Sequence, residues 1–254
     1  MKIILAPFRW LYVIYALLAF ISIMFLLLPA FVIFSRSGPV TGANRMIRLC
    51  MFWADSWMLL VFMRHKNFYE VPHDTSKPTV FVANHISFID AVILVKTIRQ
   101  HFRPLGRAET AKLPIFGYIY KNAIVTVDRS DPENRAESVR KMKELLQKGV
   151  SIFVFPEGTF NMTNAPLKSF YDGAFRIAIE TNTPIKPLLF LDGYSLMHYR
   201  SPFSLLPGES RSIYLEEIPV EGYTIEDLPV LKKKVMELME QKLVEYNAPW
   251  INKG

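Results

Sequence analysis

Hydrophobic residues dominate the first part of the chain and alternate with polar residues later. Residues Trp10–Ser35 include no charged side chain, and Arg9 and Arg36 bracket them. As a helix rising about 1.5 Å per residue, this run would reach roughly 39 Å, which exceeds the ~30 Å hydrocarbon core of a bilayer. It is therefore predicted to span a membrane with some tilt. Two alternatives stay open: a signal peptide, which the length of the run and the lack of an A-x-A site disfavour, and a shorter re-entrant segment ending at Pro29.

A second apolar stretch, Leu49–Met63, is too short to span a bilayer alone and contains Asp55. Arg45 and Arg48 precede it and Arg64 follows it. This pattern is typical of an amphipathic helix lying at a membrane interface, but an ordinary core helix would have it too. Residues 1–66 are thus predicted to form an N-terminal membrane-associated helical segment.

After residue 70, short apolar runs alternate with helical patterns. Strands are predicted at Thr79–Ala83, Asn122–Val127, Val150–Phe155, Ile185–Leu191 and Ser212–Ile218. Helices are predicted at Phe88–Arg99, Pro132–Lys148 and Ala174–Glu180, with a last helix that Thr224 caps and that runs to about Tyr246. This alternation indicates an α/β domain over residues 67–254, with a mixed, largely parallel central sheet flanked by helices.

Charge and cysteine content narrow the class of protein. The net charge is +7, and residues 1–66 carry seven bases and one acid, so only +1 is left for the rest. A nucleic-acid partner is not expected, because its basic footprint would cover the folded domain. The excess instead suits contact with anionic lipid, and its larger share after the first apolar run predicts that the folded domain lies on the cytoplasmic side. The single cysteine, Cys50, excludes a disulfide scaffold and a zinc ribbon.

His85 and Asp90 are the first candidates for chemistry. His85 follows a predicted strand, where open α/β sheets bind ligands. Five residues of continuous helix turn through about 500°, so the two side chains can meet only if His85 lies on the turn before the helix. Ser87 would then be the N-cap, with Asp90 as its reciprocal partner. A carboxylate on one imidazole nitrogen leaves the other free to deprotonate a hydroxyl of the substrate. The alternative is purely structural: His85 bonds a backbone carbonyl and Asp90 completes a capping box.

Three further segments carry polar residues at strand ends. Glu157, Gly158 and Thr159 follow an apolar strand, and the backbone N–H groups at Gly158 are predicted to be able to bind an anion. Arg129, after another strand, could bind a phosphate or pair with a neighbouring aspartate. The prolines in the fourth segment, Asn182–Leu188, are expected to shape the backbone.

Together these motifs resemble the glycerolipid acyltransferase family, and most of all its 1-acylglycerol-3-phosphate acyltransferases. The resemblance rests on Asn-His-x-x-x-x-Asp, a strand ending in Asp-Arg, Phe-Pro-Glu-Gly-Thr and Pro-Ile-x-Pro, over roughly residues 75–195. It implies transfer of a fatty acyl group from acyl-CoA or acyl carrier protein to the free hydroxyl of a lysolipid, at a membrane and without a metal or other cofactor. It also implies roles for individual residues: His85 as general base, Asp90 as its orienting partner, Glu157, Gly158 and Thr159 in the acceptor site, and Arg129 and Arg107 as candidates for phosphate contact.

The chain departs from the family pattern at two places. Phe160 stands where the family usually has arginine, and Asp172 stands where a basic residue commonly precedes Gly-Ala. Phenylalanine cannot replace the bidentate donors of arginine. Either Lys168, Arg129 or Arg107 compensates, or the acceptor is another lysolipid, such as a lyso-ornithine or lyso-glycine lipid. A non-catalytic lipid-binding protein is a third hypothesis, and a hydrolase is a further rival, although the chain lacks a G-x-S-x-G elbow.

Overall fold

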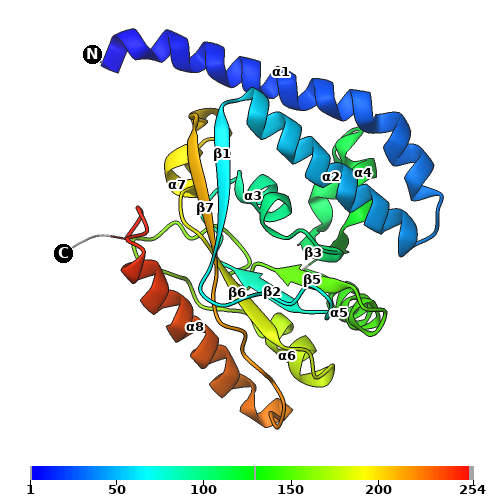
Figure 1. Ribbon diagram of the computed structural model, residues 1–254. Coiled ribbons are helices and arrows are strands. Elements are labelled where there is room, and N and C mark those ends of the chain that lie inside the picture. The colour runs from blue at the N-terminus through cyan, green and yellow to red at the C-terminus, as the bar shows by residue number, and fades with distance from the viewer. Residues whose placement is uncertain (1, 129, 252–254) are drawn as a thin grey trace.

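The computed structural model describes residues 2–128 and 130–251 (Figure 1). Two long helices, α1 (Lys2–Ser35) and α2 (Thr41–Leu60), form a hairpin that lies along one edge of an α/β body. α1 continues through Pro29 without a break, so the expected alternative of a segment ending there is not the one observed. Its residues Phe8–Ser35 are long and apolar enough to cross a membrane by length and composition, which is compatible with membrane association.

The two helices pack through large aromatic side chains. The indoles of Trp53 and Trp57 donate hydrogen bonds to the carbonyls of Phe20 (3.1 Å) and Ala16 (2.8 Å), which lie on α1. The Phe20 ring also contacts the Trp53 ring at 4.3 Å. On the opposite face of α2, Phe52 and Leu59 are exposed. One face of α2 therefore belongs to the core, while the other keeps the apolar character expected of an interfacial helix.

Seven strands form one sheet in the order β1-β7-β6-β2-β5-β3-β4. They are β1 (Met63–Tyr69), β2 (Val80–Ala83), β3 (Phe102–Arg107), β4 (Val125–Val127), β5 (Ser151–Val154), β6 (Ile185–Phe190) and β7 (Gly208–Tyr214). Only the β6–β7 pair is antiparallel within the described residues. The predicted mixed, largely parallel sheet is thus confirmed.

Helices cover both faces of the sheet, and each face has its own apolar cluster. The longer ones in the body are α3 (Asp90–Thr97), α4 (Phe116–Ala123), α5 (Pro132–Gln147), α6 (Gly173–Glu180) and α8 (Leu228–Glu245). The short elements are α7 (Gly193–Leu196) and the 3₁₀ turns η1 (Ala108–Lys112), η2 (Pro202–Ser204) and η3 (Ile225–Asp227). One cluster joins α1, α2, α3 and α4 to the sheet, and the other joins α5, α6 and α8 to its opposite face. Strands between these layers are buried on both sides, as the apolar runs predict.

Several predicted boundaries were wrong by a few residues. α3 begins at Asp90 and not at Phe88, because the preceding residues form a turn. Residues 122 and 123 belong to α4, so the strand predicted from Asn122 starts only at Val125. The strand predicted at Ser212–Ile218 lies earlier, at Gly208–Tyr214. Thr224 forms its capping box with Asp227 around η3, one turn before α8 begins.

Candidate active site

The site lies at the carboxyl end of β2, where the chain turns into α3. Nδ1 of His85 lies 2.8 Å from Oδ2 of Asp90, so the predicted contact between the two side chains is present. The same Oδ2 accepts the backbone N–H groups of Ile86 and Ser87, each at 2.8 Å. Because an ionised carboxylate only accepts hydrogen bonds, the imidazole donates through Nδ1, which leaves Nε2 as the acceptor.

Ser87 takes part in this turn differently from the expected N-cap. Its N–H donates to Asp90, as the capping box predicts. Its hydroxyl, however, accepts the N–H of Ile89 at 3.2 Å and donates to the carbonyl of Met197. The helix starts at Asp90, so Ser87 stabilises the turn before the helix and links it to the α7 segment.

Aromatic rings fix the orientation of the His85 imidazole. The ring of Phe155 stacks on it with centroids 3.9 Å apart and an angle of 11°. Phe160 contacts it edge-on at 4.4 Å, and Phe88 contacts Phe160 in turn at 4.8 Å. The surroundings of the imidazole are therefore apolar on both sides, and Phe160 occupies space directly beside it.

His85 lines a cavity of about 490 Å³ that the sequence did not reveal. The lining is mostly apolar and comes largely from α2, α3, β3, α4 and the loop after β5, with Phe20 of α1, Thr110 of η1 and the turn after β2 completing it. Representative residues are Trp53, Val92, Leu105 and Ile119. Cys50 also lines it, and burial raises the pKa of its thiol to about 12, so the thiol stays protonated and is a poor nucleophile. A cavity of this volume and composition suits a small apolar ligand or an acyl chain.

The Glu157 carboxylate holds two loops together. It is buried, and its oxygens accept the backbone N–H groups of His85 (2.8 Å) and Lys168 (2.9 Å). Burial raises the pKa of Glu157 to about 7, against the opposing effect of these two hydrogen bonds. Each oxygen of the Glu157 carboxylate thus accepts a backbone N–H group, and through one of these hydrogen bonds the carboxylate restrains the position of His85.

Gly158 has φ +73°, a conformation that favours glycine. Its N–H donates to the carbonyl of Phe155 at 3.0 Å, which closes the turn. The N–H of Gly158 itself is therefore engaged within the turn, and anion binding by this loop stays a prediction. Next to it, the exposed Thr159 hydroxyl accepts a hydrogen bond from Lys168 Nζ at 2.6 Å.

Arg107 and Arg129 are the remaining basic residues predicted to contact phosphate. Arg107 lines the cavity at the end of β3 and pairs with Glu109 at 3.4 Å, on the exposed surface. Arg129 lies outside the described residues. Among the described residues, no cluster of histidine, cysteine and acidic side chains could hold a metal ion. The structure thus brings His85, Asp90, Glu157 and Gly158 together, with Arg107 on the wall of the same cavity.

Asn84 is a site residue that sequence reasoning missed. Its side-chain amide donates to the carbonyl of Phe190 (2.9 Å) and accepts the N–H of the same residue (2.8 Å). This reciprocal pair joins the carboxyl ends of β2 and β6 next to His85. Its place as the first residue of the Asn-His-x-x-x-x-Asp motif was the signal for it.

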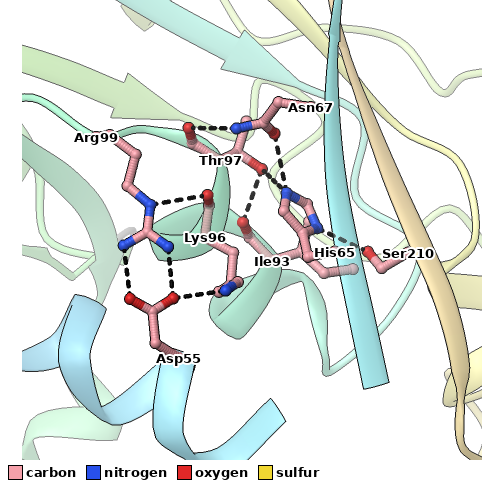
Figure 2. A network of polar contacts seen from close by, with 8 residues as sticks. All are labelled: Asp55, His65, Asn67, Ile93, Lys96, Thr97, Arg99 and Ser210. Atoms are coloured by element: carbon pink, nitrogen blue, oxygen red, sulfur yellow. Dashed lines mark hydrogen bonds and ion pairs between the residues drawn. The ribbon is translucent and has the colours of Figure 1, made fainter. Parts of the chain in front are cut away.

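The far end of α3 is tied to α2 and to β1 (Figure 2). Asp55 of α2 accepts hydrogen bonds from Lys96 and Arg99. Burial would raise the pKa of Asp55, but these hydrogen bonds hold it below its ordinary value. Beside them, Thr97 contacts His65 of β1, and burial lowers the pKa of His65 to about 4. Both ends of the short helix are therefore held, one by the site and the other by the network in Figure 2.

A comparison with solved structures supports the fold. The crystal structure of the 1-acyl-sn-glycerophosphate acyltransferase of Thermotoga maritima is similar, with a TM-score of 0.72 over 96% of this chain and 100% of that one. Its sequence identity of 21% makes this a likeness of fold.

Curated relatives share part of the sequence. A chloroplastic 1-acyl-sn-glycerol-3-phosphate acyltransferase of Brassica napus is 31% identical over 137 residues, which are 54% of this chain and 39% of the relative. The human 1-acyl-sn-glycerol-3-phosphate acyltransferase alpha is 27% identical over 169 residues, which are 65% of this chain and 58% of the relative. The chain thus spans about two-fifths to three-fifths of the length of these relatives.

The model of the Acyltransferase family matches residues 62–191, just over half of the chain. That range contains β2, the His85–Asp90 pair and the Glu157 loop. The chain therefore belongs to the acyltransferase family.

Proposed function

We propose that the chain is a membrane-bound O-acyltransferase that moves a fatty acyl group from acyl-CoA or acyl carrier protein to the free hydroxyl of 1-acylglycerol-3-phosphate. The product would be phosphatidic acid, in phospholipid biosynthesis. One observation carries the proposal: an imidazole that a buried carboxylate orients lines a large apolar cavity. The relatives, which are named 1-acyl-sn-glycerol-3-phosphate acyltransferases, support this choice of acceptor.

The reaction follows from the tautomer of His85. Nε2 accepts the proton of the acceptor hydroxyl while its oxygen attacks the thioester carbonyl, which forms the new C–O bond. Asp90 stabilises the imidazolium that results. When the tetrahedral intermediate collapses, the C–S bond breaks and the imidazolium returns the proton to the leaving thiolate. No covalent enzyme intermediate is needed, because the substrate supplies the nucleophile.

The apolar cavity supports binding of an acyl chain beside this imidazole. Its walls on α2 and α3 would bury methylene groups, each worth about 0.8 kcal/mol. Within the acceptor site, we assign Thr159 and Lys168 to the polar headgroup, since their side chains meet at 2.6 Å on the surface beside Phe160. Glu157 and Gly158 shape the loop that carries them. Arg107 and Arg129 are the other proposed phosphate ligands.

Phe160 favours a second candidate, an O-acyltransferase for a lyso-ornithine or lyso-glycine lipid. Its ring lies 4.4 Å from the imidazole, where the family resemblance implies an arginine for the acceptor phosphate. An aromatic ring cannot neutralise a phosphate monoester, so a different headgroup would suffer less from the exchange.

The N-terminal helices support a location at the membrane. We propose that residues 1–66 form the membrane-associated segment and residues 67–254 the acyltransferase domain, on the cytoplasmic side. Exposed leucines along α1, such as Leu11, Leu18 and Leu26, support burial of that face in lipid. Strand β1 begins at Met63, so the last residues of the segment also enter the sheet.

The test uses the purified full chain in detergent or vesicles. It is given acyl-CoA or acyl carrier protein thioester with 1-acylglycerol-3-phosphate, lyso-ornithine lipid or lyso-glycine lipid, and thiol release and diacyl product are measured. Phosphatidic acid formation that the His85→Ala variant loses supports the proposal. Product from the amino-acid lysolipids alone would transfer the assignment to the second candidate, and thiol release with no acceptor at all would contradict both.

A further inference from the structure

Gly193, at the start of α7, lies directly against the catalytic pair. A Cβ atom built on it would lie 2.6 Å from Oδ1 of Asp90 and 3.1 Å from Cβ of Ser87. Real Cβ atoms essentially never make contacts as short as the first, so a side chain here must displace the carboxylate or the backbone of Gly193. The backbone of Gly193 has no positive φ, so its conformation would admit alanine. Space beside Asp90 is therefore the reason for glycine at this position.

The hydrogen bonds of the Asp90 carboxylate involve only one of its two oxygens, so packing against Gly193 is needed to restrain the other. Oδ2 accepts three N–H groups, from His85, Ile86 and Ser87, whereas Oδ1 is buried and has no hydrogen-bond partner among the described residues. Hydrogen bonds thus hold one oxygen, and packing alone holds the other. A rotation of the carboxylate would move Oδ2 away from Nδ1 of His85.

The α7 segment cannot retreat easily from Asp90, because it is anchored at both ends. Before Gly193, the carboxylate of Asp192 accepts the backbone N–H of Arg211 (2.8 Å) and its guanidinium (3.0 and 2.8 Å) on β7. After it, the N–H of Met197 donates to the carbonyl of Gly193 at 2.9 Å, and the carbonyl of Met197 accepts the Ser87 hydroxyl. A clash at Gly193 would therefore be transmitted to the carboxylate.

We propose that Gly193 is a positioning residue for the acyl transfer: its lack of a side chain sets the plane of the Asp90 carboxylate, and through it the orientation of His85. The inference rests on the proposed function for its catalytic consequence, while the contact itself can be tested without any activity. Neither residue neighbours the other in sequence, since 103 positions separate Asp90 from Gly193.

The experiment compares Gly193→Ala with Gly173→Ala in the full chain. Gly173 also begins a helix, has no positive φ, and a Cβ there would meet no atom within 4 Å. Gly193→Ala is expected to lower kcat between tenfold and a hundredfold, the usual cost of moving a reacting group by up to about 1 Å, and to leave the acceptor KM within about twofold. Gly173→Ala is expected to leave both constants nearly unchanged. An unchanged kcat in Gly193→Ala would overturn the proposal.

A double-mutant cycle separates this role from a general loss of stability. In the Asp90→Ala background the carboxylate is gone, so Gly193→Ala should lower the Tm much less than it does in the wild type. Folding of the double variant, where Gly193→Ala alone fails to fold, would support the contact equally. An equal loss of Tm in both backgrounds would refute it. Should the wild-type chain show no acyl transfer, the proposed function fails, but this cycle still reports on the contact.

Discussion

Replacement of Asp90 by asparagine isolates the charge of the carboxylate that we propose to be catalytic, because the two side chains have nearly the same shape. If the amide oxygen takes the position of Oδ2, the three N–H donors keep their acceptor. The amide NH₂ group then takes the position of Oδ1, which is buried against Gly193. In this arrangement the variant loses the negative charge next to His85 and gains a buried donor without an acceptor.

The structure allows both consequences to be estimated. A unit charge pair about 4 Å apart attracts by about 4 kcal/mol at an effective dielectric constant of about 20, so loss of the imidazolium's partner should lower kcat about 10³-fold. The unpaired amide donor should cost about 1–3 kcal/mol of folding stability. In a protein of this size that corresponds to a fall in Tm of about 2–12 °C.

The assay measures kcat at saturating thioester and lysophosphatidic acid, with Tm recorded for the same preparation. Asp131→Asn is the matched control, because Asp131 is an exposed N-cap that accepts the N–H of Glu133 and asparagine caps equally well. We expect the control to keep both kcat and Tm. If Asp90→Asn kept more than a tenth of the wild-type kcat, the carboxylate would not be stabilising the imidazolium and the reasoning would fail.

Three other changes test the surroundings of the pair. The pKa of His65 is about 4 in the folded chain and about 6.5 in the unfolded chain, so its contribution to stability is present above pH 6.5 and is lost as the pH falls towards 4. At about 1.4 kcal/mol per pKa unit, this contribution is roughly 3 kcal/mol. The Tm should therefore fall more steeply with decreasing pH in the wild type than in the His65→Gln variant. Asp55→Asn removes the ion pairs of α2 with Lys96 of α3 and with Arg99 just after it, and should cost about 1 kcal/mol of stability at low salt and less at 1 M salt. A loss of stability that does not depend on salt would contradict that origin. Glu157→Gln sets an amide NH₂ against one of two backbone N–H donors, so it should cost about 1–3 kcal/mol of stability and lower kcat, whereas wild-type values of both would show that the carboxylate does not position His85.

The parts of the site that could be predicted depend on local sequence. His85 and Asp90 are five residues apart, and the turn that joins them is fixed by N–H groups within the same segment. The requirement that His85 lie before the helix came from helix geometry alone, and the structure meets it. Apolar strands such as β5 were also predictable, because burial on both faces leaves an uninterrupted apolar run.

The cavity was not predictable, because its walls come from segments whose patterns are misleading. β3, which lines the cavity, contains Pro104 and Gly106, which usually disfavour a strand. β1 lies outside the cavity and was also not predicted, because its half-exposed position at the sheet edge gives it a polar run. β1 also pairs with β7, whose residues are about 145 positions away in sequence, so its register has no local signal. α4 follows Ile115, whose φ of +59° no pattern of apolar residues announces.

The order of the strands explains how one pair of side chains receives support from distant parts of the chain. β6, β2 and β5 are adjacent and parallel, so their carboxyl ends meet at one edge of the sheet. The loop after β5 brings Glu157 to the backbone of His85, and the loop after β6 brings Gly193 to the carboxylate of Asp90. Each neighbour of β2 thus restrains a different member of the pair, and antiparallel pairing of either neighbour would send its loop to the opposite edge. The parallel topology is therefore a condition for the geometry of the site, as well as a description of the fold.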